Sequence, residues 1–456
     1  MAVLTLALGI GANTAIFSVV NAVLLQPLPY QDSSRLVAIS QVILQTGSNG
    51  VPVSFTKFSQ IREQARTLES TAAYYSLTAS LVTEREPEAI NGARVSNDFF
   101  KVLRVPPVRG RSFLPEEEQT GAADVAVISD GFWHSHFGGQ EDVLGRNLSL
   151  DGKNVTIVGV LPASFKFPLQ FPEPDVWLPR VTEISFLTPA QIRTGAGYLG
   201  VVARLRDGES IARAQAELDT INGRYKEQFG NYVDATRFAL SASSLEESLV
   251  GALRPSLLVL LAAVGFVLLI ACANVANLLL ARATSREREI AVRKALGASR
   301  MRLIRQMLSE SLLLSLGGGV VGVLLAMLSL PALRALSPGT VPRLAEAKID
   351  PVVLVFSLVL CCATGIIFGL IPSLQAAGKE LQESLKEGSR GSSEGGSRGV
   401  FRAILVVGEI AVALLLMTVA GLLMDSFARL MQVNPGFSTK NLMTFPSPRN
   451  SPCSTR

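Results

Sequence analysis

The chain has 456 residues, of which 48% are hydrophobic and only 17% charged, against about 25% charged residues in soluble proteins. Its net charge of +5 comes from basic residues beside long apolar runs, so it gives no argument for nucleic-acid binding. The composition excludes an ordinary soluble protein and indicates a membrane protein.

Five apolar runs are long enough to cross a bilayer, which takes about 20 residues of helix. They are residues 3–25, 256–280, 312–330, 352–370 and 403–424. The first run shows neither a basic start nor a clear cleavage site, which a signal peptide would have. We therefore interpret 1–25 as a retained membrane helix, with loss of a native basic N-terminus as an open alternative.

A polar block of about 230 residues separates the first two runs and is large enough for its own core. It contains no cysteine, so disulfides cannot stabilise it. Strands are predicted at 35–44 and 198–208, and Asp151-Gly152 predicts a β-hairpin over 147–162. Helices are predicted at 54–70, with Ser54 as N-cap, and at 209–229. The expected fold is an α-helical membrane protein with a large α+β domain between helices 1 and 2.

Basic residues in short loops predict the orientation, because such loops stay cytoplasmic. Segment 282–305 holds eight Lys/Arg and segment 377–402 holds five, against three in 331–350. We therefore expect a bacterial plasma-membrane protein with a cytoplasmic N-terminus and with 26–255 outside. Cys272, Cys361 and Cys362 lie in membrane spans, and we interpret them as packing residues.

Two stretches resemble a known family. VSNDFFKVLRVPPVRGRSFLPEEE (95–118) and VAVISDGFWHSHFGGQEDVLGRNLSLDGKNVTIVGVLPASFKFP (125–168) resemble the periplasmic core domain of MacB-type ABC transporter permeases. LLIACANVANLLLARATSREREIAVRKALGASRMRLIRQMLSESLLL (268–314) resembles the FtsX-type permease domain. The likeness implies a core domain at 26–250 and a permease domain at 256–376. It is greatest to duplicated acidobacterial permeases, in which this module occurs twice.

In FtsX-type permeases the cytoplasmic segment between the second and third helices contacts an ATPase subunit. The resemblance therefore implies that the same segment docks an ATPase here, through Arg286, Arg288, Ile290, Arg293, Lys294 and Leu296. On the residues alone, Gly297 can end one helix and Ser299 can cap the next, which makes a helical elbow. The alternative is that the basic residues only set topology and bind anionic lipids.

The sequence contains no G-x-x-x-x-G-K-[ST] loop to hold a nucleotide phosphate. MacB carries its ATPase domain before its first helix, and this chain begins at that helix. We therefore expect no catalytic residue, no cofactor and no metal here, and a separate ABC ATPase as partner. The other expected partners are the bilayer, a second copy or partner permease, and a periplasmic adaptor.

Small and polar residues within the spans predict helix packing. The proposed packing residues are Gly318, Gly322, Gly365, Gly369, Asn274 and Asn277. Glu409 lies inside the fifth run, where a charge is costly and raises the question of a coupling role. His134 and His136 lack a third metal ligand, so we interpret them as surface or packing residues.

The Gly- and Ser-rich part of 377–402 predicts a flexible cytoplasmic linker to the helix 403–424. Residues 425–456 look like the entry to a second module that stops early, which suggests a truncation or frameshift.

The expected function is the permease subunit of an ABC efflux system. Two alternatives stay open: FtsX-like transmission of force to external partners without transport, and a simple external sensor.

Overall fold

The computed structural model describes residues 1–82, 87–167, 173–184, 186–285, 292, 299–336, 343–378 and 396–432. These residues form two compact units, which we treat separately. The membrane unit contains Met1–Gln26 and the described residues from Leu253 onward, and the α+β unit contains those of Pro27–Ala252.

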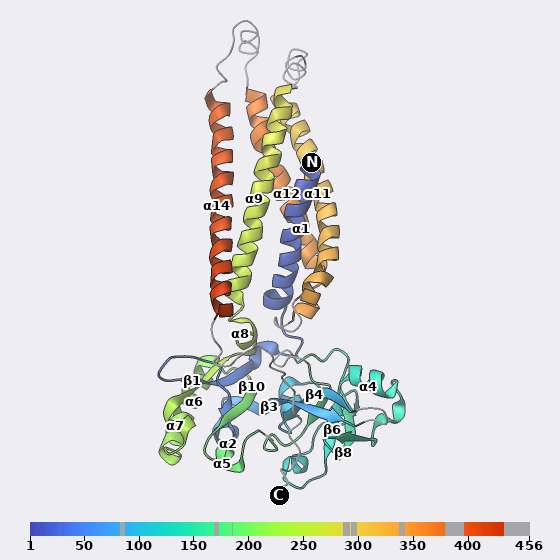
Figure 1. Cartoon of the computed structure of the whole chain (residues 1–456), viewed down its shortest axis with the longest axis vertical. Coiled ribbons are helices and arrows are strands. Elements are labelled where there is room, and N and C mark those ends of the chain that lie inside the picture. The colour runs from blue at the N-terminus through green and yellow to red at the C-terminus, as the bar shows by residue number, and fades with distance from the viewer. Residues whose placement is uncertain are drawn as a thin grey trace. The chain divides into compact units, whose positions relative to one another are not determined.

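The described part of the membrane unit contains five helices that are long and apolar enough to span a bilayer, as the sequence predicts (Figure 1). They are α1 (Ala2–Val20), α9 (Arg254–Ser285), α11 (Arg300–Leu336), α12 (Pro351–Gly378) and α14 (Gly396–Gln432). A π-helical turn, η1 (Asn21–Leu25), continues α1, so the first apolar span is Ala2–Leu25.

Two helices begin earlier than predicted. The third apolar run is expected at 312–330, but α11 begins at Arg300. The charge-free run marks only the segment that suits hydrocarbon, whereas the helix continues past it through basic residues. Similarly, α14 begins at Gly396, so residues 396–402 of the predicted linker are helical. Residues 379–395 and 433–456 lie outside the described residues.

Helix α1 is the centre of the membrane unit. Of its most apolar stretch, 61% is buried, against 28–33% for α9, α11 and α12 and 0% for α14. It packs against α9, α11 and α12, while α14 packs against α9. A helix that is largely buried among other helices needs small residues for close approach and partners for its polar groups.

The α+β unit is built on one sheet of eleven strands among the described residues. The main path runs β11-β1-β10-β3-β4-β9-β6-β8-β5, with β2 beside β10 and β7 beside β3 and β8. The strands are β1 (Leu36–Ile43), β2 (Val53–Ser54), β3 (Leu68–Leu81), β4 (Glu88–Val95), β5 (Arg109–Gly110), β6 (Val125–Ile128), β7 (Asn147–Leu150), β8 (Lys153–Val160), β9 (Val176–Leu178), β10 (Gly197–Leu205) and β11 (Phe238–Ser244).

Seven described α-helices accompany the sheet (Figure 1). They are α2 (Phe55–Gln64), α3 (Phe99–Leu103), α4 (Asp130–Phe137), α5 (Pro189–Arg193), α6 (Ile211–Gln228), α7 (Val233–Arg237) and α8 (Leu245–Val250). Apolar side chains of α2 and α6 pack with β1, β3 and β10 in one cluster, and those of α4 pack with β6–β9 in another. The 14-residue strand β3 joins the two regions, because its first half pairs with β10 and its second half with β4.

The predicted hairpin at 147–162 is confirmed: β7 and β8 pair with Leu150 opposite Lys153. Asp151 and Gly152 both have positive φ, as a tight two-residue turn requires. The strand predicted at 35–44 is β1, and that at 198–208 is β10.

The helix predicted at 54–70 is correct at its start, since Ser54 Oγ accepts a hydrogen bond from Lys57 N (3.2 Å), but it ends at Gln64. The Glu217 carboxylate accepts from the backbone N–H groups of Arg66 (2.7 Å) and Thr67 (2.9 Å). Leu68 then enters β3. A carboxylate 150 residues away therefore stabilises the turn that replaces the last predicted helical turn.

Candidate functional site

The residues proposed to dock an ATPase lie outside the described residues: Arg286, Arg288, Ile290, Arg293, Lys294 and Leu296. The structure describes what flanks them. Helix α9 runs to Ser285, and α11 starts again at Arg300. Ser299 precedes α11, and its Oγ accepts a hydrogen bond from Arg302 N (3.4 Å). Val292, described between the two helices, is helical and 58% exposed.

Two of the predicted packing glycines lie where α11 meets α1. A methyl group added at Gly318 would lie 2.8 Å from Leu6 Cβ, and one at Gly322 would lie 2.9 Å from the Ala7 carbonyl oxygen. On the other helix, a methyl group at Gly11 would lie 2.8 Å from the Gly322 carbonyl oxygen. The two helices therefore touch through their backbones, which only glycine permits.

The other two predicted glycines lie where α12 meets α11. A methyl group at Gly365 would lie 2.5 Å from Ser315 Oγ, and one at Gly369 would overlap Ser311 Oγ. Both serine hydroxyls donate to carbonyls of their own helix, so they are satisfied without crossing between helices. Small residues on both helices thus bring α11 and α12 together.

Sequence reasoning missed the polar face of α1. Asn13, Thr14, Ser18 and Asn21 are all buried. Asn13 Nδ2 donates to the Val264 carbonyl of α9 (2.8 Å). The signal was present as polar residues at 14, 18 and 21 of an uncharged run, a spacing that places them on one helix face. Asn13, Thr14 and Asn21 bond to other parts of the membrane unit, whereas Ser18 Oγ donates to the Thr14 carbonyl of the same helix.

The predicted polar residues of α9 have different surroundings. Asn274 Nδ2 donates to Glu409 Oε1 of α14 at 2.7 Å, so the carboxylate questioned in the sequence has an amide partner. Asn277 Oδ1 is buried and meets no donor among the described residues.

The two histidines lie on α4. His134 Nδ1 lies 2.9 Å from the Asp130 carbonyl oxygen, and His136 Nε2 lies 3.2 Å from Glu88 Oε2. No group of three or more metal-ligand side chains occurs among the described residues. The contact of His134 lies within α4, and that of His136 joins α4 to Glu88 of β4.

A buried polar network lies in the α+β unit. Lys57 Nζ donates to Gln41 Oε1 (2.9 Å) and to the Asp234 carbonyl oxygen (2.8 Å). The Asp234 carboxylate accepts from the hydroxyls of Ser54 (2.5 Å) and Tyr225 (3.1 Å). Burial lowers the pKa of Lys57 to about 8, although the nearby Asp234 charge opposes this shift. Every polar group named here has a partner, so we interpret the network as structural.

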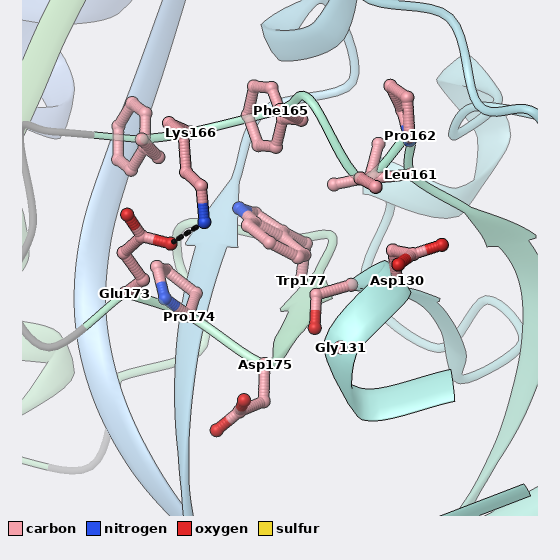
Figure 2. A pocket seen from close by; sticks show the side chains of 13 residues that line it. Asp130, Gly131, Leu161, Pro162, Phe165, Lys166, Glu173, Pro174, Asp175 and Trp177 are labelled. Carbon is pink, nitrogen blue, oxygen red and sulfur yellow. Dashed lines mark hydrogen bonds and ion pairs between the residues drawn. The ribbon is translucent and has the colours of Figure 1, made fainter. Parts of the chain in front are cut away.

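A pocket of about 300 Å³ lies beside the start of α4. Figure 2 shows Phe165 and Pro174 on two sides of the indole of Trp177, with the Lys166–Glu173 ion pair (3.2 Å) at one side. The Trp177 N–H meets no acceptor among the described residues. The indole is only 2% exposed, however, so it offers almost no surface to a ligand.

The comparisons with known proteins agree with this architecture. Residues 1–221 match the MacB-like periplasmic core domain, and residues 261–381 match the FtsX-like permease C-terminal domain. The first match covers α1 and most of the α+β unit, and the second covers most of α9 and all of α11 and α12. The chain belongs to the MacB/FtsX-like permeases of the ABC transporter family. It is a multi-pass membrane protein with a large periplasmic domain between its first helix and the rest.

Among curated relatives, the chain is similar to macrolide export ATP-binding/permease protein MacB from Shigella boydii and from Escherichia coli K12. Each is 26% identical over 288 residues, or 62% of this chain. The match spans 41% of the length of those relatives. The periplasmic region of MacB from Actinobacillus actinomycetemcomitans is 12% identical, with a TM-score of 0.36, covering 51% of this chain and 97% of its own.

Proposed function

We propose that the chain is the permease subunit of an ABC efflux system, driven by a separate ATPase that docks on segment 282–305. Two permease modules, as a homodimer or with a partner permease, form the working unit in the plasma membrane. A periplasmic adaptor is a further proposed partner. The N-terminus and segments 282–305 and 377–402 are cytoplasmic in this proposal, and 26–255 is outside.

The observation that carries the proposal is the continuity of the two helices beside the docking segment. Helix α11 runs from Arg300 through its membrane span, with Pro331 in its last two turns, and α9 runs from Arg254 to Ser285. A continuous helix is stiff along its axis, so a displacement at Arg300 reaches the far end. The exposed side chain of Val292 gives a partner apolar surface between the two helices.

Helix α1 provides the next link. It contacts α11 through Gly322 and α9 through the Asn13–Val264 hydrogen bond, and its π-helical continuation η1 ends at Leu25, two residues before Pro27, where the α+β unit begins. Displacement of α9 or α11 therefore has a packed route, within the membrane unit, to the helix that precedes the periplasmic domain in the chain.

The test is co-purification of an ATPase with the tagged chain from membranes of its native host. Reversing Arg286, Arg288, Arg293 and Lys294 to Glu should abolish co-purification, because like charges then face the partner. The purified chain alone should hydrolyse no ATP.

A matched control separates docking from topology. Reversing Lys379, Lys386, Arg390 and Arg398 to Glu changes the charge of the other basic segment by the same amount. This variant should still bind the ATPase. Loss of binding in both variants would show a general charge or topology effect, and unchanged binding in the first would contradict docking.

Transmission of force without transport is the second candidate. It is favoured by the polar residues of α1, since Asn13, Thr14 and Asn21 bond to α9, to α12 and to the residue before α12. ATP-driven movement of the periplasmic domain without substrate efflux from proteoliposomes would select this alternative.

A further inference from the structure

The end of α1 where the chain leaves the membrane unit is tied to one carboxylate. Asn21 Nδ2 donates to Asp350 Oδ2 at 2.8 Å, and Gln26 Nε2 donates to the same oxygen at 2.9 Å. We propose that Asp350 is a positioning residue that locks the exit end of α1 to the first turn of α12, so that both ends move as one piece.

The same carboxylate also starts α12. Its Oδ1 accepts from Val353 N at 2.9 Å, which caps the helix. Carboxylates are favoured at helix N-termini, where free N–H groups and the helix dipole attract negative charge. Amide donors to a carboxylate form charge-assisted hydrogen bonds. One side chain thus orders α12 and holds two donors that follow α1, Asn21 of η1 and its C-cap Gln26.

Arg343, in the connection between α11 and α12, holds the same end of α1. Its guanidinium donates to the Gln26 carbonyl oxygen at 2.7 Å and to Glu346 Oε2 at 3.0 Å. The Arg343 side chain is only 2% exposed, so it is fixed by packing as well. The last residue of the membrane unit before the α+β unit is therefore held at its side chain and at its backbone.

A second pair of contacts fixes the register of α1 along α12. The hydroxyls of Thr14 and Ser357 lie 2.9 Å apart. Thr14 lies seven residues before Asn21, and Ser357 lies seven residues after Asp350. On antiparallel helices both separations are two helical turns, or about 10 Å. Between them the rings of Phe17 and Phe356 stack at 3.8 Å. Sliding or rotation of α1 on α12 would break all of these contacts together.

The consequence concerns the residue where the chain changes unit. Gln26 is bonded covalently to Pro27, the first residue of the α+β unit. Movement of the start of α12 therefore reaches Gln26 directly, through the hydrogen bond between Asp350 and the Gln26 side chain. The lock is a property of the membrane unit and does not depend on which ATPase, if any, drives it.

Asp350→Asn separates the lock from the cap. Asn caps helices about as well as Asp, so one oxygen can still accept from Val353 N. The other group becomes an NH₂ donor, so Asn21 and Gln26 can pair with it only by turning their own amide oxygens toward it, and the charge that strengthens both hydrogen bonds is lost. We expect backbone amides of residues 21–26 to exchange hydrogen roughly tenfold faster, while those of α12 stay protected.

The experiment is hydrogen–deuterium exchange on the full chain in lipid nanodiscs. The double variant Asn21→Asp/Asp350→Asn exchanges donor and acceptor and should restore protection at 21–26. Asp425→Asn is the matched control, since it removes an exposed carboxylate from an Arg429 pair in the same unit and should change nothing at 21–26.

Unchanged exchange at 21–26 in Asp350→Asn, or failure of the double variant to restore it, would overturn the lock. If Asp350→Asn loses protection throughout α1, α9, α11 and α12, Gln26→Met decides, because it removes one donor only. Faster hydrogen exchange of Gln26→Met confined to residues 21–26 then supports the lock. Exchange equal to that of the unsubstituted chain contradicts it.

Discussion

The backbones of Gly11 in α1 and Gly322 in α11 lie in direct contact. A methyl group at Gly11 would lie 2.8 Å from the carbonyl oxygen of Gly322, and one at Gly322 would lie 2.9 Å from the nitrogen of Gly11. Such distances leave no room for a side chain on either helix. Glycine at both positions therefore allows α1 and α11 to approach this closely.

This contact predicts that Gly322→Ala lowers the free energy of unfolding of the membrane unit by about 1–3 kcal/mol, because the helices must separate. Gly317 is the matched control on the same helix, since a methyl group there would meet nothing within 4 Å. Gly317→Ala should be neutral or slightly stabilising. The measurement is helical circular dichroism during SDS titration of the protein in micelles. Equal effects of the two substitutions would contradict the packing account.

Removal of α14 should leave the rest of the chain folded. None of its most apolar stretch is buried, and among the described residues the Glu409–Asn274 hydrogen bond joins it to α9. Hydrogen bonds between membrane helices contribute about 0.6 kcal/mol on average, so the loss is small. Fragment 1–395 should insert into membranes and keep a protease-resistant periplasmic domain. Degradation of the fragment would show that α14 belongs to the folded unit.

The buried Lys57 predicts that the periplasmic domain becomes more stable as pH rises from about 8. Its folded pKa is lowered to about 8 from an ordinary value near 10.5, so above pH 8 the unfolded chain binds more protons. The free energy of unfolding should therefore increase by roughly 1–2 kcal/mol between pH 8 and 9.5. Below pH 8 this contribution should not change further. Above pH 10 the effect reverses, because burial raises the pKa of Tyr198 to about 12 and unfolded tyrosines then release protons first.

Tryptophan fluorescence during urea unfolding of the full chain measures this directly, because both tryptophans, Trp133 and Trp177, lie in the periplasmic domain. In Lys57→Met the increase between pH 8 and 9.5 should disappear, although the variant is less stable overall. The exposed Lys226→Met should keep it. If the free energy of unfolding of Lys57→Met still increases between pH 8 and 9.5 as in the parent protein, another group causes the increase.

Topology is tested by cysteine labelling with an impermeant thiol reagent in spheroplasts. Ser164 is an exposed residue of the periplasmic domain and suits this labelling. Ser164→Cys and Ser337→Cys should react in intact spheroplasts, and Ser389→Cys only after permeabilisation. Reaction of Ser389→Cys in intact spheroplasts would reverse the predicted orientation.

Much of the fold could be predicted from local patterns. The turn at Asp151-Gly152 and the five apolar runs depend on residues next to one another in the chain. The end of α2 could not be predicted, because it depends on Glu217, 150 residues away in the sequence. The start of α11 was missed because hydrophobicity alone does not show where a helix begins outside the membrane.

The candidate packing residues were selected correctly as residue types, but their partners are tertiary. Gly322 gives no sign in the sequence that it faces Gly11, and Asn274 gives none that it faces Glu409. Asp350 was overlooked because it lies just outside an apolar run, where an acidic residue looks like an ordinary helix cap. Its two α1 donors, more than 300 residues away, become visible only in the structure.

The most direct test of the proposed function is photocross-linking from Val292, which lies between α9 and α11 in the docking segment. A benzophenone amino acid there should cross-link, in native membranes, to a protein that carries the G-x-x-x-x-G-K-[ST] loop. The same group at Val355, similarly exposed on α12 (61% against 58%), should not. Mass spectrometry identifies the product. An ATPase captured from Val292 alone is the result we predict, and capture from neither position or equally from both would contradict docking on this segment.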